Sequence, residues 1–90
     1  MTPLQLFRLE GRVAFISGSR GHLGAAMTRA LCAAGAHVII NGRDAVALAD
    51  FAAALAGEGY AVSPASCDAH GVDEIRGFFG ALPRLDILVN

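Results

Sequence analysis

The chain has ninety residues, enough for one small domain that buries about 60–65% of its unfolded surface. Hydrophobic residues make up 54% of the sequence and charged residues 17%, a balance that predicts folding rather than disorder. The net charge of −1 offers no electrostatic basis for binding nucleic acid or an anionic membrane, and we expect neither partner. All seven basic residues are arginines, so these residues supply no lysine to any mechanism.

Targeting and metal-binding signals are also missing from the sequence. No stretch approaches the roughly 20 apolar residues that a membrane span requires. The segment 1–10 lacks a basic region followed by a long apolar core, so we expect no secretory signal and a cytoplasmic location. Cys32 and Cys67 fit no metal or redox spacing and are predicted to be reduced structural thiols.

The first predicted elements are a strand and a helix. A continuous apolar run over 13–17 predicts a strand that is buried on both faces. Leu23, Met27 and Leu31 then recur with a helical period. Beside them runs a row of alanines, which we expect to face a sheet closely: Ala26, Ala30 and Ala34. Gly35 is predicted to cap the end of this helix.

A second strand and helix follow with the same alternation. The β-branched residues of 37–40 predict another buried strand. Asp44 is suited to cap the start of a second helix. The apolar face of that helix is predicted to contain Leu48, Phe51 and Leu55. Gly57 and Gly59 are expected to break the helix.

The remaining residues predict two more strands around a third helix. The segment 60–66 reads as a strand, and Pro64 within it favours a place at the sheet edge. A helical period predicts a helix before Pro83, with apolar positions Val72, Ile75, Phe79 and Leu82. Residues 86–90 form the fourth predicted strand. The βαβαβαβ order predicts an α/β Rossmann-type three-layer fold with a parallel sheet in strand order 3-2-1-4.

The turn between the first strand and the first helix is rich in glycine. A dinucleotide pyrophosphate requires a sharp turn, close approach of the backbone and free amides at a helix start. Gly18, Gly21 and Gly24 meet these needs, and the loop follows a predicted strand and opens a predicted helix. We expect the cofactor to contact Gly18, Ser19, Arg20, Gly21, Leu23 and Gly24.

This loop resembles the TGxxxGxG pattern of the short-chain dehydrogenase/reductase family. Ser17 stands for the usual threonine, and Gly21 gives the TGxxGxxG spacing of the family's extended branch. His22 replaces the middle glycine and either faces solvent, which we favour, or contacts phosphate. The standard branch is resembled by the segments 9–14, 67–68 and 85–90, the last matching "xDILVN". The resemblance spans nearly the whole chain and is closest to the gluconate 5-dehydrogenase and 3-oxoacyl reductase group.

The turn after the second strand indicates which cofactor is bound. A carboxylate there would accept hydrogen bonds from the adenosine ribose and repel a 2′-phosphate. Gly42 occupies this place instead, and Arg43 offers a planar cation suited to phosphate, with Arg20 as a second candidate. We therefore predict NADP, with NAD as the weaker alternative; the competing interpretation is that Arg43 is a solvated turn residue.

Two further residues are assigned by the resemblance. It implies that Asp68 receives the adenine amino group, although an aspartate before a helix is also a common cap. It implies that Asn90 supports the loop beside the adenosine ribose. On this basis residues 1–90 are expected to be the N-terminal part of a single NAD(P)-binding Rossmann domain, truncated after the fourth strand.

The residues that would perform catalysis are not found in the sequence. The resemblance implies a Ser, Tyr and Lys group with the spacing YxxxK, but Tyr60 precedes Pro64 at that spacing and no lysine exists. We therefore predict no catalytic residue and no activity in the ninety residues alone. The longer protein would be a homo-oligomeric reductase that interconverts a small-molecule alcohol and a carbonyl compound.

Two alternative functions stay open at this point. The chain could be a non-catalytic nucleotide-binding remnant or sensor module. It could also serve another Rossmann-fold activity, such as methyl transfer, although Gly42 disfavours that choice because such enzymes want an acid there to hold a ribose.

Overall fold

The computed structural model describes residues 8–18, 21–66 and 85–89, and every structural statement refers to these ranges. Their elements are β1 (Val13–Ile16), α2 (His22–Ala33), β2 (His37–Gly42), α3 (Ala45–Gly57), β3 (Val62–Ser66) and β4 (Ile87–Val89). The third helix predicted before Pro83 lies outside the described residues.

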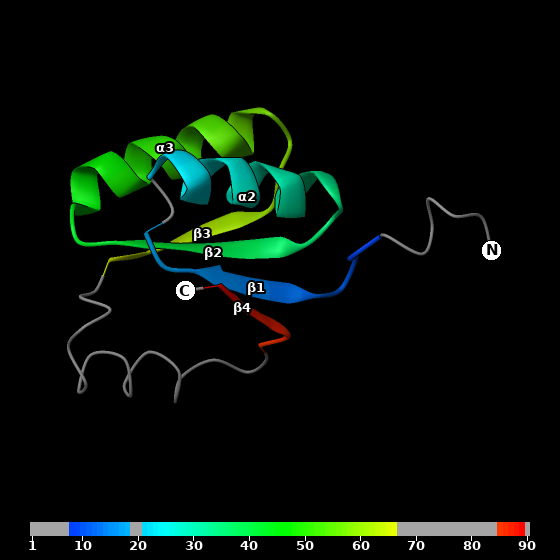
Figure 1. Ribbon diagram of the computed structural model, residues 1–90. Helices are drawn as coiled ribbons and strands as arrows, with labels where there is room; N and C mark the ends of the chain where they lie inside the picture. Colours follow the sequence, from blue (N-terminus) through cyan, green and yellow to red (C-terminus); the bar gives the residue numbers. More distant parts are fainter. Residues whose placement is uncertain (1–7, 19–20, 67–84, 90) are drawn as a thin grey trace.

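The strands form one parallel sheet in the order β3-β2-β1-β4, which confirms the predicted α/β fold and strand order. Both described helices lie on the same face of this sheet (Figure 1). Right-handed crossovers between parallel strands place successive helices on one face in this way. β3, which carries Pro64, lies at an edge of the sheet as predicted.

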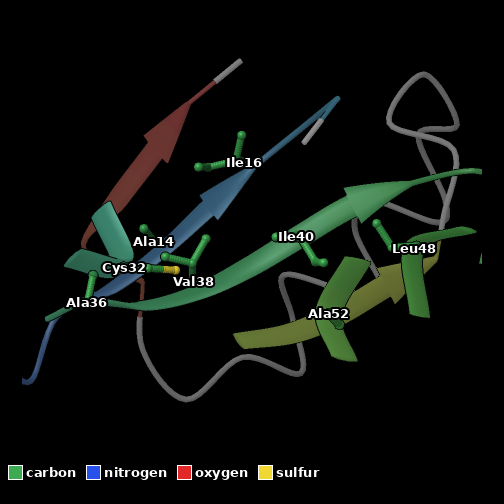
Figure 2. Packing of buried hydrophobic residues seen from close by; sticks show 8 residues of the cluster. All are labelled: Ala14, Ile16, Cys32, Ala36, Val38, Ile40, Leu48 and Ala52. Carbon is green, nitrogen blue, oxygen red and sulfur yellow. The ribbon is translucent and has the colours of Figure 1, made fainter. Parts of the chain in front are cut away.

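Apolar side chains cover both faces of the sheet. On the helix side, buried residues from strands and helices form one cluster (Figure 2): Ala14, Ile16, Cys32, Ala36, Val38, Ile40, Leu48 and Ala52. On the other side, Phe15 and Ile39 pack with Ala65. Neighbouring residues of β1 and β2 therefore point into different clusters, which explains why both strands are continuous apolar runs.

The face of α2 that packs on the sheet agrees only in part with the predicted one. Met27 and Leu31 are half-buried and pack against the core as predicted, whereas Leu23 is 71% exposed and Ala26 and Ala30 are exposed. The fully buried residues of the helix are Thr28 and Cys32, so the buried stripe is centred one residue later than the leucine period. Thr28 can be buried there because its hydroxyl donates to the Gly24 carbonyl at 2.7 Å, so no polar atom is left unpaired.

The ends of the helices also correct the sequence prediction in detail. Ala34 is the cap residue of α2, and Gly35 follows it with a φ of 102°, in the left-handed region that favours glycine. Gly57 is the last helical residue of α3, and only Gly59, with a φ of 92°, breaks the chain direction. Asp44 caps α3 as predicted, accepting from the Ala47 N–H at 3.1 Å.

The amino ends of β1 and β4 are joined by one side chain. Asp86 Oδ2 accepts from the Val13 N–H at 2.8 Å, and the Asp86 N–H donates to the Val13 carbonyl at 2.8 Å. The Arg12 guanidinium adds an ion pair to the same carboxylate at 3.5 Å. These contacts join β1 to β4 at the amino ends of the strands, opposite the end that carries the glycine-rich loop.

Two further observations bear on the predictions made from composition. Cys32 is a free, buried cysteine, and its burial raises the pKa of the thiol, as expected for a structural residue. None of the helices in the described ranges has the length and apolar character that crossing a bilayer requires.

Candidate functional site

The carboxyl ends of the strands meet at one edge of the sheet, and the predicted site residues follow them. Ile16, at the end of β1, pairs with Ile40 of β2 and with Val89 of β4. The ladder between β2 and β3 ends at Gly42 and Ser66. In an open parallel sheet, ligands bind beside the carboxyl ends of the strands, so this edge is the candidate site.

The turn from β1 into α2 is described at its two glycines, Gly18 and Gly21. Gly18 has a φ of 64°, a left-handed conformation that a side chain would strain. The Gly21 N–H donates to the Gly18 carbonyl at 3.0 Å and closes the turn. A Cβ on Gly21 would lie 3.4 Å from the Gly18 oxygen, at the limit of ordinary contact.

Within the described residues, no side chain caps the start of α2. Gly21 is the N-cap residue and makes no side-chain cap, and the first turn contains no acidic residue. The first intrahelical bond runs from the Ala25 N–H to the Gly21 carbonyl at 2.8 Å. The amides of the first turn precede this bond and lie at the positive end of the helix, where an anion is favoured.

The side chains of this first turn point mainly to solvent. Leu23 is 71% exposed although it is a large apolar residue, and His22 is exposed beside it. Gly24 is half-buried. The structure thus brings Gly18, Gly21, Leu23 and Gly24 together in one turn and the helix start that follows it.

The second turn, from β2 into α3, presents a free cation. Arg43 is exposed, and no hydrogen bond or ion pair joins it to another residue of the described ranges. Gly42 does not have a left-handed φ, and a Cβ there would meet only Leu48 Cδ1 at 3.5 Å, an ordinary contact. The backbone therefore does not require glycine at position 42, and the missing carboxylate is not a steric necessity.

One residue at this edge was not found from the sequence. Asn41 is buried, and its side-chain Nδ2 donates to the Ala65 carbonyl at 2.9 Å, across to β3. The available signal was a polar residue that directly follows the apolar run of β2. Four predicted site residues lie outside the described ranges: Ser19, Arg20, Asp68 and Asn90. Inside those ranges, no group of His, Cys, Asp and Glu side chains could hold a metal ion.

Comparison with known proteins identifies the family. No protein-family model matches the chain. Gluconate 5-dehydrogenase of Gluconobacter oxydans is 31% identical over 94 aligned residues, which cover 100% of this chain and 37% of the relative. A rhamnolipid-biosynthesis 3-oxoacyl-[acyl-carrier-protein] reductase of Pseudomonas aeruginosa is 38% identical over 87 residues, covering 93% of this chain and 34% of the relative.

Solved structures agree with these relatives. A gluconate 5-dehydrogenase of Burkholderia cenocepacia, crystallised with NADP and tartrate, superposes with a TM-score of 0.87 at 34% identity over 97% of this chain and 36% of its own. A metagenomic short-chain oxidoreductase in complex with NADP superposes with a TM-score of 0.80 at 31% identity, covering 89% of this chain and 38% of its own. Over nearly its whole length, the chain is thus similar to short-chain dehydrogenase/reductase proteins. It spans about a third of the length of the relatives it matches.

The predicted resemblance to this family, and to its gluconate 5-dehydrogenase and 3-oxoacyl reductase members, is thereby confirmed. The relatives that it matches are oxidoreductases. The roles of its individual site residues stay predictions, which the described geometry makes specific enough to test.

Proposed function

We propose that the chain forms the NADP(H)-binding part of a short-chain oxidoreductase that interconverts an alcohol and a carbonyl compound. The observation that carries this proposal is the pairing of two features at one sheet edge: the uncapped start of α2 and the free, exposed Arg43. Two similar solved structures, which were crystallised with NADP, support the choice of cofactor. NAD is the weaker alternative.

The glycine-rich turn fits the pyrophosphate of such a cofactor. Gly18 and Gly21 carry no side chain that would keep phosphate oxygens from the backbone, and the α2 amides would donate to them. Ser19 and Arg20 belong to the same loop and are proposed as further contacts. Leu23, exposed on the first turn, would give the cofactor an apolar surface to pack against. When bound, NADPH would supply the hydride for carbonyl reduction.

The second turn would determine the preference for the 2′-phosphate. A carboxylate at position 42 would repel this phosphate, whereas Gly42 carries no charged side chain. The Arg43 guanidinium would form a charge-assisted hydrogen bond with it. Because Arg43 has no internal ion pair in the described ranges to break first, its charge would be fully available to the ligand.

Other parts of the proposal concern residues and properties beyond this edge. Asp68 and Asn90 are proposed to serve the adenine and the adenosine ribose. The ninety residues contain no lysine, so we propose that they bind the cofactor without themselves reducing a carbonyl compound. A small-molecule substrate, assembly into a homo-oligomer and a cytoplasmic location are further predictions for the whole protein.

Titration of NADPH and NADH into the protein that carries this sequence tests the proposal. A hydrogen bond to a charged group contributes roughly 1.5–3 kcal/mol, so Arg43→Ala should weaken NADPH binding about ten- to a hundredfold. NADH binding should change little, and any compensation by Arg20 would reduce the loss. Gly42→Asp should also weaken NADPH and give the NADH ribose an acceptor, without a steric clash at Leu48.

Arg8→Ala is the matched control for these variants. Arg8 is an exposed arginine that pairs with Glu10 near the opposite edge of the sheet, so its loss changes the net charge equally, away from the site. It should leave both affinities unchanged. Equal losses for NADPH and NADH in Arg43→Ala, or tighter binding of NADH by the unmodified protein, would contradict the proposed preference.

A further inference from the structure

Asn41 is a buried polar residue that links two strands. Asn41 is 2% exposed and Thr28 is 0% exposed, and they are the buried polar residues of the described ranges. The Thr28 hydroxyl bonds within its own helix, whereas Asn41 Nδ2 donates across the sheet to the Ala65 carbonyl at 2.9 Å. No buried side-chain nitrogen or oxygen in the described ranges lacks a hydrogen-bond partner. The Asn41 amide is therefore a structural connector.

Asn41 lies directly before the turn from β2 into α3, which contains Arg43. Asn41 pairs with Ala65 in the ladder of β2 and β3, and the ladder ends one residue later at Gly42 and Ser66. Arg43 follows immediately and makes no hydrogen bond or ion pair with another residue of the described ranges. The position and direction of the backbone at Arg43 thus depend on how the end of β2 is held against β3.

We propose that Asn41 is a positioning residue for 2′-phosphate selectivity, which acts through Arg43; this inference rests on the proposed function. A long, exposed arginine loses rotamer freedom when it binds phosphate, and a backbone already held in the bound direction lowers that cost. The backbone ladder alone could slide or twist at its final pair. The side-chain bond from Asn41 to Ala65 adds a directional contact there, protected from competing water by burial.

The substitution Asn41→Leu tests this role, because leucine has the same branching and the same number of side-chain heavy atoms but is apolar and cannot donate to Ala65. We expect NADPH binding to weaken about three- to tenfold and NADH binding to change less than about twofold. Asn41→Ser, which keeps a shorter donor, should give a smaller loss of the same selectivity. It also serves as the test variant if Asn41→Leu does not fold, as judged by circular dichroism.

Ser63→Ala is the matched control, because it removes another side-chain bond between the same two strands. Ser63 Oγ lies 2.7 Å from Nε2 of His37. His37 is the first residue of β2, at the opposite end of the strand from Arg43. Either substitution should weaken the pairing of β2 with β3, so both variants should unfold at a lower temperature. The ratio of NADPH to NADH affinity should change only with Asn41.

A double-mutant cycle with Arg43→Ala decides whether Asn41 acts through Arg43. In the Arg43→Ala background, Asn41→Leu should have little further effect on NADPH, since the group that it positions is gone. An equal loss for both cofactors, or an undiminished effect in that background, overturns the positioning role. A protein that binds NADPH no better than NADH, or whose Arg43→Ala variant shows no selective loss, contradicts the proposed function instead.

Discussion

The two described turns from strand to helix lie at the same edge of the sheet but begin their helices differently. α3 starts with Asp44, whose carboxylate accepts from the Ala47 N–H at 3.1 Å. α2 starts with Gly21, which has no side chain to do this. Within the described residues, a side chain thus caps the start of α3 but not that of α2. This contrast is why we propose α2, not α3, as the helix that receives an anion.

The backbone conformation of the two turns differs in the same sense. Gly18 needs glycine because its φ is 64°, whereas Gly42 has an ordinary strand conformation with space for a side chain. Substitution in the first turn therefore alters the backbone itself, while substitution in the second alters charge. We accordingly expect changes in the first turn to affect NADPH and NADH alike, and changes in the second to discriminate between them.

Gly21→Asp would make the first turn resemble the second and should have the largest effect. The Gly21 backbone, with φ of −63° and ψ of 162°, suits a capping residue. The new carboxylate would occupy the amides of α2 and repel phosphate, so binding of both cofactors should fall roughly ten- to a hundredfold. Thermal unfolding should meanwhile show a helix no less stable than that of Gly21→Ala.

Gly21→Ala separates the charge of this variant from its bulk. It introduces the same Cβ at 3.4 Å from the Gly18 oxygen but no carboxylate. Its effect on binding should be clearly smaller than that of Gly21→Asp. If both variants bound the cofactors equally, the uncapped amides of α2 would not be the anion site.

Gly18→Ala should have the next largest effect. No atom lies within 4 Å of the added Cβ, so the cost is conformational. A left-handed conformation costs an alanine about 1–2 kcal/mol, which corresponds to about a five- to thirtyfold loss for both cofactors if the bound turn keeps its shape. Isothermal titration measures this loss.

Gly57→Ala is the corresponding glycine control. Gly57 lies in helical conformation at the end of α3 with open space around its Cα, so alanine should leave binding unchanged and raise stability slightly. Unchanged cofactor binding by Gly18→Ala would show that the left-handed turn is not needed for the ligand.

Asp44→Ala tests the other side of the comparison and should have the smallest effect. It removes the cap of α3, and loss of such a cap costs about 1 kcal/mol of folding free energy. Denaturant unfolding measures the change. Asp50→Ala removes an equal charge from an exposed position inside α3 and should alter the free energy of unfolding by less than about 0.5 kcal/mol. Similar costs for the two variants would mean that capping contributes nothing special.

Local patterns in the sequence were sufficient for the order of elements, the parallel sheet and both glycine positions in the first turn. A switch between a continuous apolar run and a helical period needs no tertiary information, and parallel strands joined by helices allow few arrangements. Asp44 could be recognised as a cap for the same reason, because capping depends on residues within one turn. The predictions for Arg43 and Gly42 also rest on local sequence, a cation and a missing acid after a strand, and they stay predictions.

Contacts between distant segments decided the remaining features. The buried stripe of α2 is centred on Thr28 and Cys32, whereas the leucine period placed it one residue earlier, where only Met27 and Leu31 pack against the core. Asn41 gained its partner only when β3 came to lie beside β2, through a pairing that spans 24 residues of sequence. Hydrophobic periodicity identifies a buried face but carries no information about its rotation against a partner, and a polar residue in a strand does not reveal which carbonyl it will meet. Both depend on the positions of atoms that the chain brings together only by folding.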